Sequence, residues 1–194
     1  MLRIAIPLLL ALALSSCGKY GPPVPPEALS PAAVHELRAE GAAEGVKLSW
    51  RSPEADLRGQ DLKSLDGYRI YRKLSFGIED VATGTRPEGG QESDYELLAT
   101  IPDSHVADLK KLKDEALAAG KPARRLKAPD SAKEFSFTDP KVAAGKTYLY
   151  RVVPFNQGDT EGRVTKLLKV TFNGEQTASS LVAVSEAEDL EDLF

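Results

Sequence analysis

The chain has 194 residues, with 25 Lys and Arg against 29 Asp and Glu and a formal net charge of -4. This length suits one medium domain with tails or insertions, and a hydrophobic fraction of 42% is enough for a packed core. The mild negative charge argues against general nucleic-acid binding, and two histidines leave few ways to build a metal site or a histidine-based catalytic site.

The N-terminus has the parts of a secretory signal peptide. Met1–Arg3 is positively charged, Ile4–Leu14 is apolar but too short to span a bilayer, and two serines lead to Cys17. The string LSSC at 14–17 resembles the lipobox of bacterial lipoproteins. The resemblance implies a cleaved signal peptide over 1–16 and attachment of palmitate-type acyl chains to Cys17, which would hold the protein at a membrane. The alternative is an ordinary secreted protein with a free thiol.

A proline-rich linker is expected over 17–31. It contains Pro22, Pro23, Pro25, Pro26 and Pro31. Proline fixes φ, so this lipid-anchored linker should be a semi-rigid stalk. Gly18, rather than Asp, follows the cysteine, which by resemblance to bacterial lipoproteins favours the outer membrane. The opening CGKYGPPVPP is also similar to the start of small lipoproteins that accompany the lipopolysaccharide-assembly machine.

From residue 32 onward, short segments alternate apolar and polar residues and are separated by turn residues, which is typical of β-strands. The expected strands are Val34–Ala39, Val46–Trp50, Tyr68–Arg72, Tyr95–Ile101, Phe135–Thr138, Tyr148–Val153 and Leu167–Phe172. About seven such strands predict an all-β antiparallel sandwich.

The ordered strings VKLSW, GYRIYRK, LLATI, FTD and GKTYLYRVVPFN resemble a fibronectin type III domain over most of 31–173. The resemblance places Trp50, Tyr68 and Ile70 in the core and makes Tyr148 the tyrosine of the corner before a strand. Trp50, Tyr68, Tyr148 and Tyr150 are therefore interpreted as core residues and not as a sugar-stacking platform. Tyr71 lies on the opposite strand face and is expected to point to solvent.

Two insertions, 74–93 and 103–133, depart from the fibronectin pattern. The first is rich in glycine, which predicts a loop. In the second, Ser104 can cap a helix that Gly120 and Pro122 end, which predicts a helix over 104–119. Its apolar positions, listed next, form one stripe and predict that the helix lies against the sandwich. They are Val106, Leu109, Leu112, Ala116 and Leu117.

The second insertion is basic, and the end of the chain is acidic. The candidate anionic-contact residues are Lys110, Lys111, Lys113, Lys121, Arg124, Arg125 and Lys127. Near a bilayer such a cluster can bind anionic headgroups or lipopolysaccharide phosphates; alternatively it is a solvated helix face. Residues 174–194 are interpreted as an acidic C-terminal tail. Its leucine and phenylalanine spacing leaves open a short docking peptide for a partner.

No catalytic or cofactor motif surrounds either histidine, and Cys17 is expected to be acylated, so the sequence predicts neither an enzyme nor a cofactor nor a metal site. The favoured function is a lipid-anchored envelope lipoprotein that acts as a binding or scaffold module for a protein or glycan partner. An accessory subunit of an outer-membrane assembly or export complex is the alternative. An envelope hydrolase is a third hypothesis, disfavoured by the lack of a site.

Overall fold

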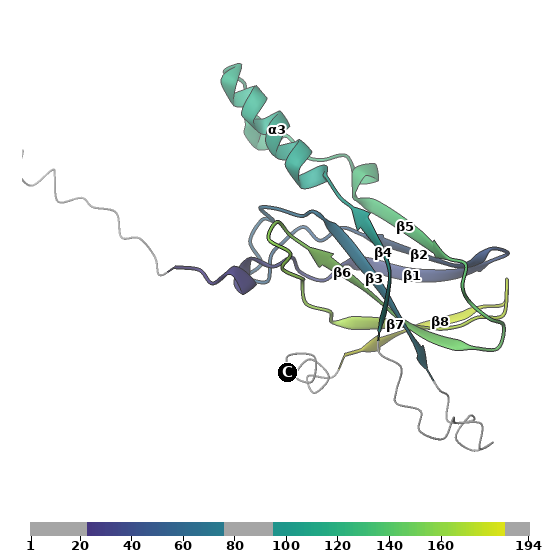
Figure 1. The fold of residues 1–194 in the computed structure, drawn as a ribbon. Helices are drawn as coiled ribbons and strands as arrows, with labels where there is room; N and C mark the ends of the chain where they lie inside the picture. Colours follow the sequence, from purple (N-terminus) through teal and green to yellow (C-terminus); the bar gives the residue numbers. More distant parts are fainter. Residues whose placement is uncertain (1–22, 76–94, 185–194) are drawn as a thin grey trace, which may run out of the picture.

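Two antiparallel sheets face each other in the computed structural model, which describes residues 23–75 and 95–184 (Figure 1). The smaller sheet, in the order β1-β2-β5, consists of β1 His35–Ala42, β2 Gly45–Arg51 and β5 Glu134–Asp139. The larger sheet, in the order β4-β3-β6-β7-β8, consists of β3 Gly67–Ser75, β4 Glu96–Pro102, β6 Thr147–Phe155, β7 Lys166–Thr171 and β8 Ala178–Ala183. The predicted all-β, fibronectin type III-like sandwich is confirmed.

The helical elements of the described residues are one α-helix and three short 3-10 helices. They are α3 His105–Ala118, η1 Pro26–Leu29, η2 Ala123–Arg125 and η3 Asp130–Lys133. The α-helix falls within the helical insertion predicted at 104–119. In Figure 1 it leaves the top of the sandwich and points away from both sheets.

The seven expected strands correspond to β1 through β7, and β8 is an additional strand. It follows a turn at Gly174 and pairs with β7, with Thr171 opposite Ala178. This strand lies within the segment 174–194 that was interpreted as a tail. The acidic residues beyond 184, most of the insertion 74–93 and the whole N-terminus to residue 22, with Cys17, lie outside the described residues.

The core forms where alternating residues of β2, β3 and β6 meet between the sheets. Trp50 of β2 is 2% exposed and Tyr68 of β3 is 0% exposed, and their ring centroids lie 5.4 Å apart in an edge-to-face arrangement. Tyr150 of β6 is also fully buried. The prediction that these aromatic residues are core residues is therefore confirmed. Each such ring buries on the order of 150–250 Å² of surface.

Two tyrosine hydroxyls on β6 bind the turn that precedes the strand. The Tyr148 hydroxyl accepts a 3.0 Å hydrogen bond from the backbone N–H of Ala143, as the tyrosine-corner resemblance implies. The Tyr150 hydroxyl donates a 2.8 Å hydrogen bond to the buried carboxylate of Asp139, which also accepts one of 2.9 Å from Arg72. Tyr71, by contrast, is half-buried on the outward face and donates to Glu161.

Substitution of Trp50 by alanine should lower the free energy of unfolding by about 3–5 kcal/mol, because it leaves a cavity between the sheets. Denaturant unfolding measures the change. Leu97→Ala on β4 is the control, since Leu97 is 50% exposed, and it should cost about 0.5 kcal/mol or less. Equal effects of the two substitutions would contradict the assignment of Trp50 to the core.

Stability should fall in alkali because of two buried tyrosines. Burial, together with the hydrogen bond to Asp103, raises the pKa of Tyr68 well above its ordinary value, and burial beside the charge of Asp139 does the same for Tyr150. The unfolded chain loses these protons near pH 10 while the folded protein keeps them. The free energy of unfolding should thus be unaffected by these groups below about pH 10 and fall above it by about 1.4 kcal/mol per pH unit for each tyrosine.

Denaturant unfolding between about pH 8 and pH 11.5 tests this slope around the tyrosine pKa. Tyr150→Phe should make the decline shallower, because one group that titrates only in the unfolded chain is removed. A free energy of unfolding that stays constant across this range would refute the assignment.

Candidate functional site

The base of α3 is fixed to the core by one buried carboxylate. Asp103, 6% exposed, accepts a 2.6 Å hydrogen bond from the Tyr68 hydroxyl and a 2.9 Å hydrogen bond from the backbone N–H of His105. Its Oδ1 also lies 2.7 Å from Nδ1 of His105. Ser104, the predicted cap, instead donates its hydroxyl to Asp108 and makes no cap hydrogen bond to the backbone. The capping acceptor is therefore Asp103.

Beyond its first turns the helix does not pack on the sandwich, so the expectation that it lies against the sheets is wrong. Val106 is partly buried against the core, but no helix residue is fully buried. Leu112 and Leu117 of the predicted stripe are 52% and 63% exposed. The helix extends past the sheet, and what faces it there is the returning chain, in which Ala123 is 8% exposed.

The chain reverses direction sharply at the end of α3. Gly120 has φ +67, a backbone conformation that favours glycine, and the Lys121 N–H donates a 2.8 Å hydrogen bond to the carbonyl of Ala116. The returning segment then forms η2 beside the helix. This reversal brings basic residues on the helix close to basic residues that follow it.

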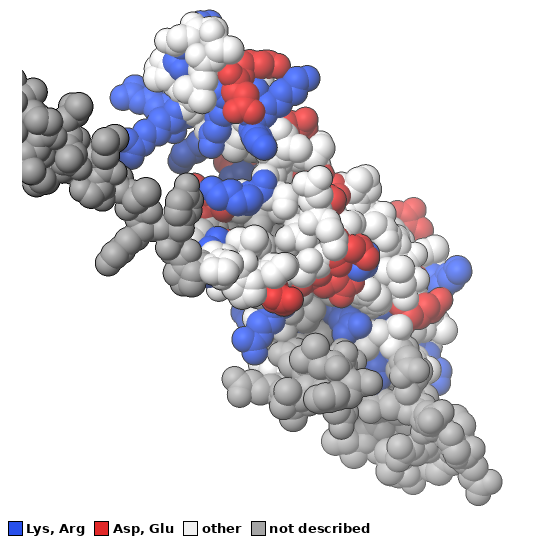
Figure 2. Space-filling view, turned by 60° about the vertical axis from the view of Figure 1, so that its left-hand side comes forward, with Lys and Arg blue, Asp and Glu red and all other residues white. Residues whose placement is uncertain are grey.

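The seven predicted anionic-contact residues thus gather around one protrusion and form what we name the basic cluster. Its members are Lys110, Lys111, Lys113, Lys121, Arg124, Arg125 and Lys127. Figure 2 shows lysine and arginine side chains crowded over this part of the molecule, with carboxylates beside them. All members are exposed except Lys113, which is half-buried. Within the described ranges, none of the seven forms an ion pair.

A cleft of about 340 Å³ separates the protrusion from the loop between β2 and β3. Three members of the basic cluster, Lys113, Arg124 and Lys127, line it together with His105. The apolar part of the lining comes from Leu62, Val106, Leu109 and Leu126. We name this hollow the basic cleft. It combines cations with apolar side chains, whereas the four other members of the basic cluster lie outside its lining.

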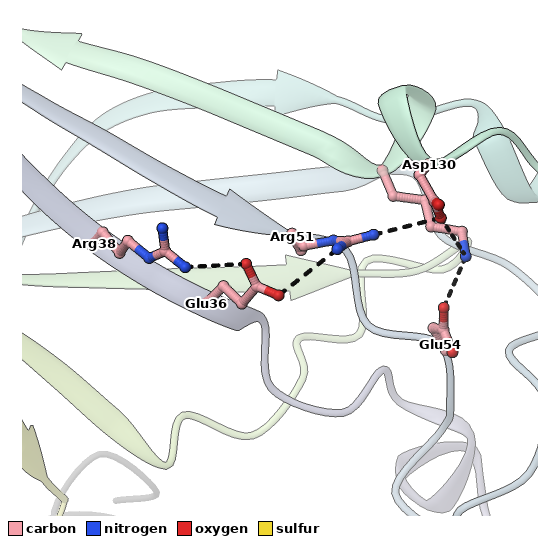
Figure 3. A network of polar contacts seen from close by, with 6 residues as sticks. Glu36, Arg38, Arg51, Glu54 and Asp130 are labelled. Carbon is pink, nitrogen blue, oxygen red and sulfur yellow. Dashed lines mark hydrogen bonds and ion pairs between the residues drawn. The ribbon is translucent and has the colours of Figure 1, made fainter.

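The loop side of the basic cleft is electrostatically compensated. Lys133 donates a 2.7 Å hydrogen bond to Glu54, and this contact lowers the pKa of the Glu54 carboxyl. The pair continues into a chain of ion pairs along the smaller sheet (Figure 3). In that chain Arg51 lies 3.4 Å from Asp130 and 3.6 Å from Glu36. The uncompensated positive charge of the basic cleft therefore belongs to the protrusion, with Asp61 as the one further carboxylate in the lining.

The two histidines lie in different surroundings. His35 begins β1, which is an edge strand. His105 is bound to Asp103, and its side-chain contact there holds the helix base. In residues 23–75 and 95–184 no three His, Cys, Asp or Glu side chains are grouped as metal ligands, and no helix is long and apolar enough to cross a membrane.

Comparison with known proteins identifies no family. No family model and no curated protein matches the sequence. Among 21 similar solved chains is the third fibronectin III domain of human KIAA0343 protein, with 13% identity and a TM-score of 0.43 over 84% of this chain and 99% of that one. Another is the twitchin kinase region from C. elegans, with 15% identity and a TM-score of 0.40 over 76% of this chain. This chain spans only 17% of the twitchin region. The strand order described above, rather than these scores, carries the fold assignment.

Removal of the Asp103 side chain should detach the base of α3. Asp103→Ala leaves the buried Tyr68 hydroxyl without this acceptor, which should lower the free energy of unfolding by about 1–3 kcal/mol. Hydrogen exchange of the α3 amides should accelerate more than exchange in β6. Asp108→Ala is the matched control, because Asp108 is exposed and, among the described residues, its side chain is hydrogen-bonded to Ser104 alone. Unchanged exchange in α3 of Asp103→Ala would show that this carboxylate does not hold the helix.

Proposed function

We propose that this protein is a lipid-anchored lipoprotein of the bacterial envelope whose sandwich acts as a non-catalytic binding or scaffold module. The lipobox-like string at 14–17 supports the anchor, with Cys17 as the acylated residue. Gly18 supports the outer membrane as its location. The fibronectin type III-like fold supports a binding role, because such sandwiches present loops and sheet edges to partners. The partner is a protein or glycan of the envelope.

One observation indicates which end of the sandwich would lie nearest the anchor. The chain enters the sandwich at the end that carries the basic cleft. Ser30 accepts a 3.0 Å backbone hydrogen bond from Leu57, and Ala32 donates one of 2.9 Å to Ala55. Both partners belong to the loop that also supplies Glu54 and Leu62 to the basic cleft. The first described segment is therefore hydrogen-bonded to the loop that lines the basic cleft.

Chain length then limits how far this end can lie from an anchor. Five residues lie between Cys17 and Pro23, which makes six steps along the chain. A fully extended chain covers at most about 3.6 Å per step, or about 22 Å. An acylated Cys17 would consequently keep Pro23 within about 22 Å of the membrane surface. The basic cleft lies at the same end, which would place it near the leaflet, where anionic lipids attract Lys and Arg side chains. In this arrangement the protein would act at the membrane surface by binding and not by catalysis.

The opening CGKYGPP favours a second candidate, an accessory subunit of an outer-membrane assembly or export complex. Cross-linking in intact membranes followed by affinity purification separates the two candidates. Barrel or translocon components should be recovered with an accessory subunit, whereas a general scaffold module should recover other envelope proteins or glycans.

Substitution Cys17→Ser should abolish acylation, because a serine hydroxyl does not replace the thiol that receives the lipid. Metabolic labelling with palmitate followed by membrane fractionation measures this. The labelled wild-type protein should sediment with membranes and the variant should carry no label. Ser15→Ala, which keeps the cysteine and a small residue, should remain labelled. Label retained on the Cys17→Ser protein would rule out the proposed anchor.

A further inference from the structure

We infer that the basic cleft is a binding site for the phosphate headgroup of an anionic phospholipid in the membrane that holds the anchor. This inference rests on the proposed function, since the anchor is what places the cleft at a leaflet. It goes further by assigning the ligand class and three residues. Lys113, Arg124 and Lys127 bind the phosphate, and the apolar lining takes the adjoining hydrocarbon of the lipid.

The charge of the cleft is the first argument. Lys113 comes from α3, whereas Arg124 and Lys127 come from the segment that returns beside it, so three cations from two elements converge on one hollow. None of the three has an ion-pair partner in the part of the chain that the structure describes. Asp61 is the one carboxylate in the lining besides Glu54, which is paired with Lys133. The three cations outnumber it and repel one another, so an anion between them removes that cost.

The floor of the cleft is the second argument. A basic surface in solvent needs no hydrocarbon in its lining, yet Leu62, Val106 and Leu109 line this hollow together with the cations. Leu126, also in the lining, is 37% exposed. An amphiphile matches both features at once, because its phosphate meets the cations while its methylene groups cover the exposed leucine. Such apolar contact also lowers the local dielectric and strengthens the charge attraction.

The position of the cleft is the third argument, and it favours a membrane lipid over a soluble phosphate. The loop that forms one wall is the same loop to which the first described segment is hydrogen-bonded. A tether at that end keeps the cleft at the surface where anionic headgroups are concentrated, and multivalent contact then needs only modest affinity for each headgroup.

Lysine footprinting of the reconstituted protein tests the site. The protein purified from membranes is placed in vesicles of phosphatidylcholine alone or of phosphatidylcholine with phosphatidylglycerol, and amine acetylation is followed at each lysine by mass spectrometry. Lys113 and Lys127 should react several-fold more slowly in the anionic vesicles. Lys141, Lys146 and Lys169, which are exposed and lie outside the basic cluster, should react alike in both. Equal rates for Lys113 and Lys127 in the two vesicles would overturn the inference.

Two matched triple variants distinguish the cleft from a diffuse basic surface. The cleft variant is Lys113→Gln, Arg124→Gln and Lys127→Gln. The outer variant is Lys110→Gln, Lys111→Gln and Lys121→Gln, with the same loss of charge on the same protrusion. Cross-linking to phosphatidylglycerol with a photoactivatable headgroup should weaken by about fivefold for each cleft cation removed and much less for the outer variant. Equal loss in both variants would show a diffuse surface and refute a defined site.

A soluble competitor identifies the source of the phosphate. Glycerol phosphate added to phosphatidylcholine vesicles should leave the acetylation of Lys113 and Lys127 unchanged. Protection at the same phosphate concentration as in the anionic vesicles would assign the cleft to a soluble phosphate and overturn the lipid assignment. Failure of the anchor appears separately, as an unmodified Cys17 in the mass of the purified protein, so the two proposals fail in distinguishable ways.

Discussion

The buried carboxylate of Asp103 is the contact on which the arrangement of the candidate site depends. A carboxylate removed from water is costly unless it is fully hydrogen-bonded, and here the hydroxyl of Tyr68, the backbone of His105 and the His105 ring supply the partners. Because Tyr68 belongs to the sandwich core and His105 begins the helix, this one group joins the two. The direction of α3, and with it one wall of the basic cleft, follows from that junction.

A second buried pair of an acid and a tyrosine joins another connecting segment to the core. Asp139 binds the hydroxyl of Tyr150 and the guanidinium of Arg72, and it accepts a 2.9 Å hydrogen bond from the backbone N–H of Lys141. It thereby fixes the turn between β5 and β6. Both pairs set a carboxylate at or just after the end of a strand against an inward tyrosine of the larger sheet. The sandwich is thus stabilised by apolar packing in its middle and by two buried carboxylates at its ends. Asp103 lies where the helical insertion begins, and Asp139 lies where the turn after β5 begins.

Sequence alone could predict most strands, because a strand with one buried face alternates visibly, as in Val46, Leu48 and Trp50. It could not predict β8, whose residues are all exposed and carry no such alternation. The bounds of α3 were predictable from local residues, but its direction depends on the long-range contact between Tyr68 and Asp103. The members of the basic cluster were visible in the sequence. The cleft was not, since Leu62 is distant from them in the chain.

The helix contacts the sandwich at its base and the returning segment η2 beyond it, so the protrusion that these two segments form is joined to the sandwich at one end. A helix of 14 residues rises about 1.5 Å per residue and is about 21 Å long. A rotation of the helix by about 10° about its base at Asp103 would move its C-terminal end by about 4 Å over that length. The opposite wall is braced by the sandwich. Such a rotation would change the width of the basic cleft, and so the size of the headgroup that fits it, while the β-sheets stay unchanged.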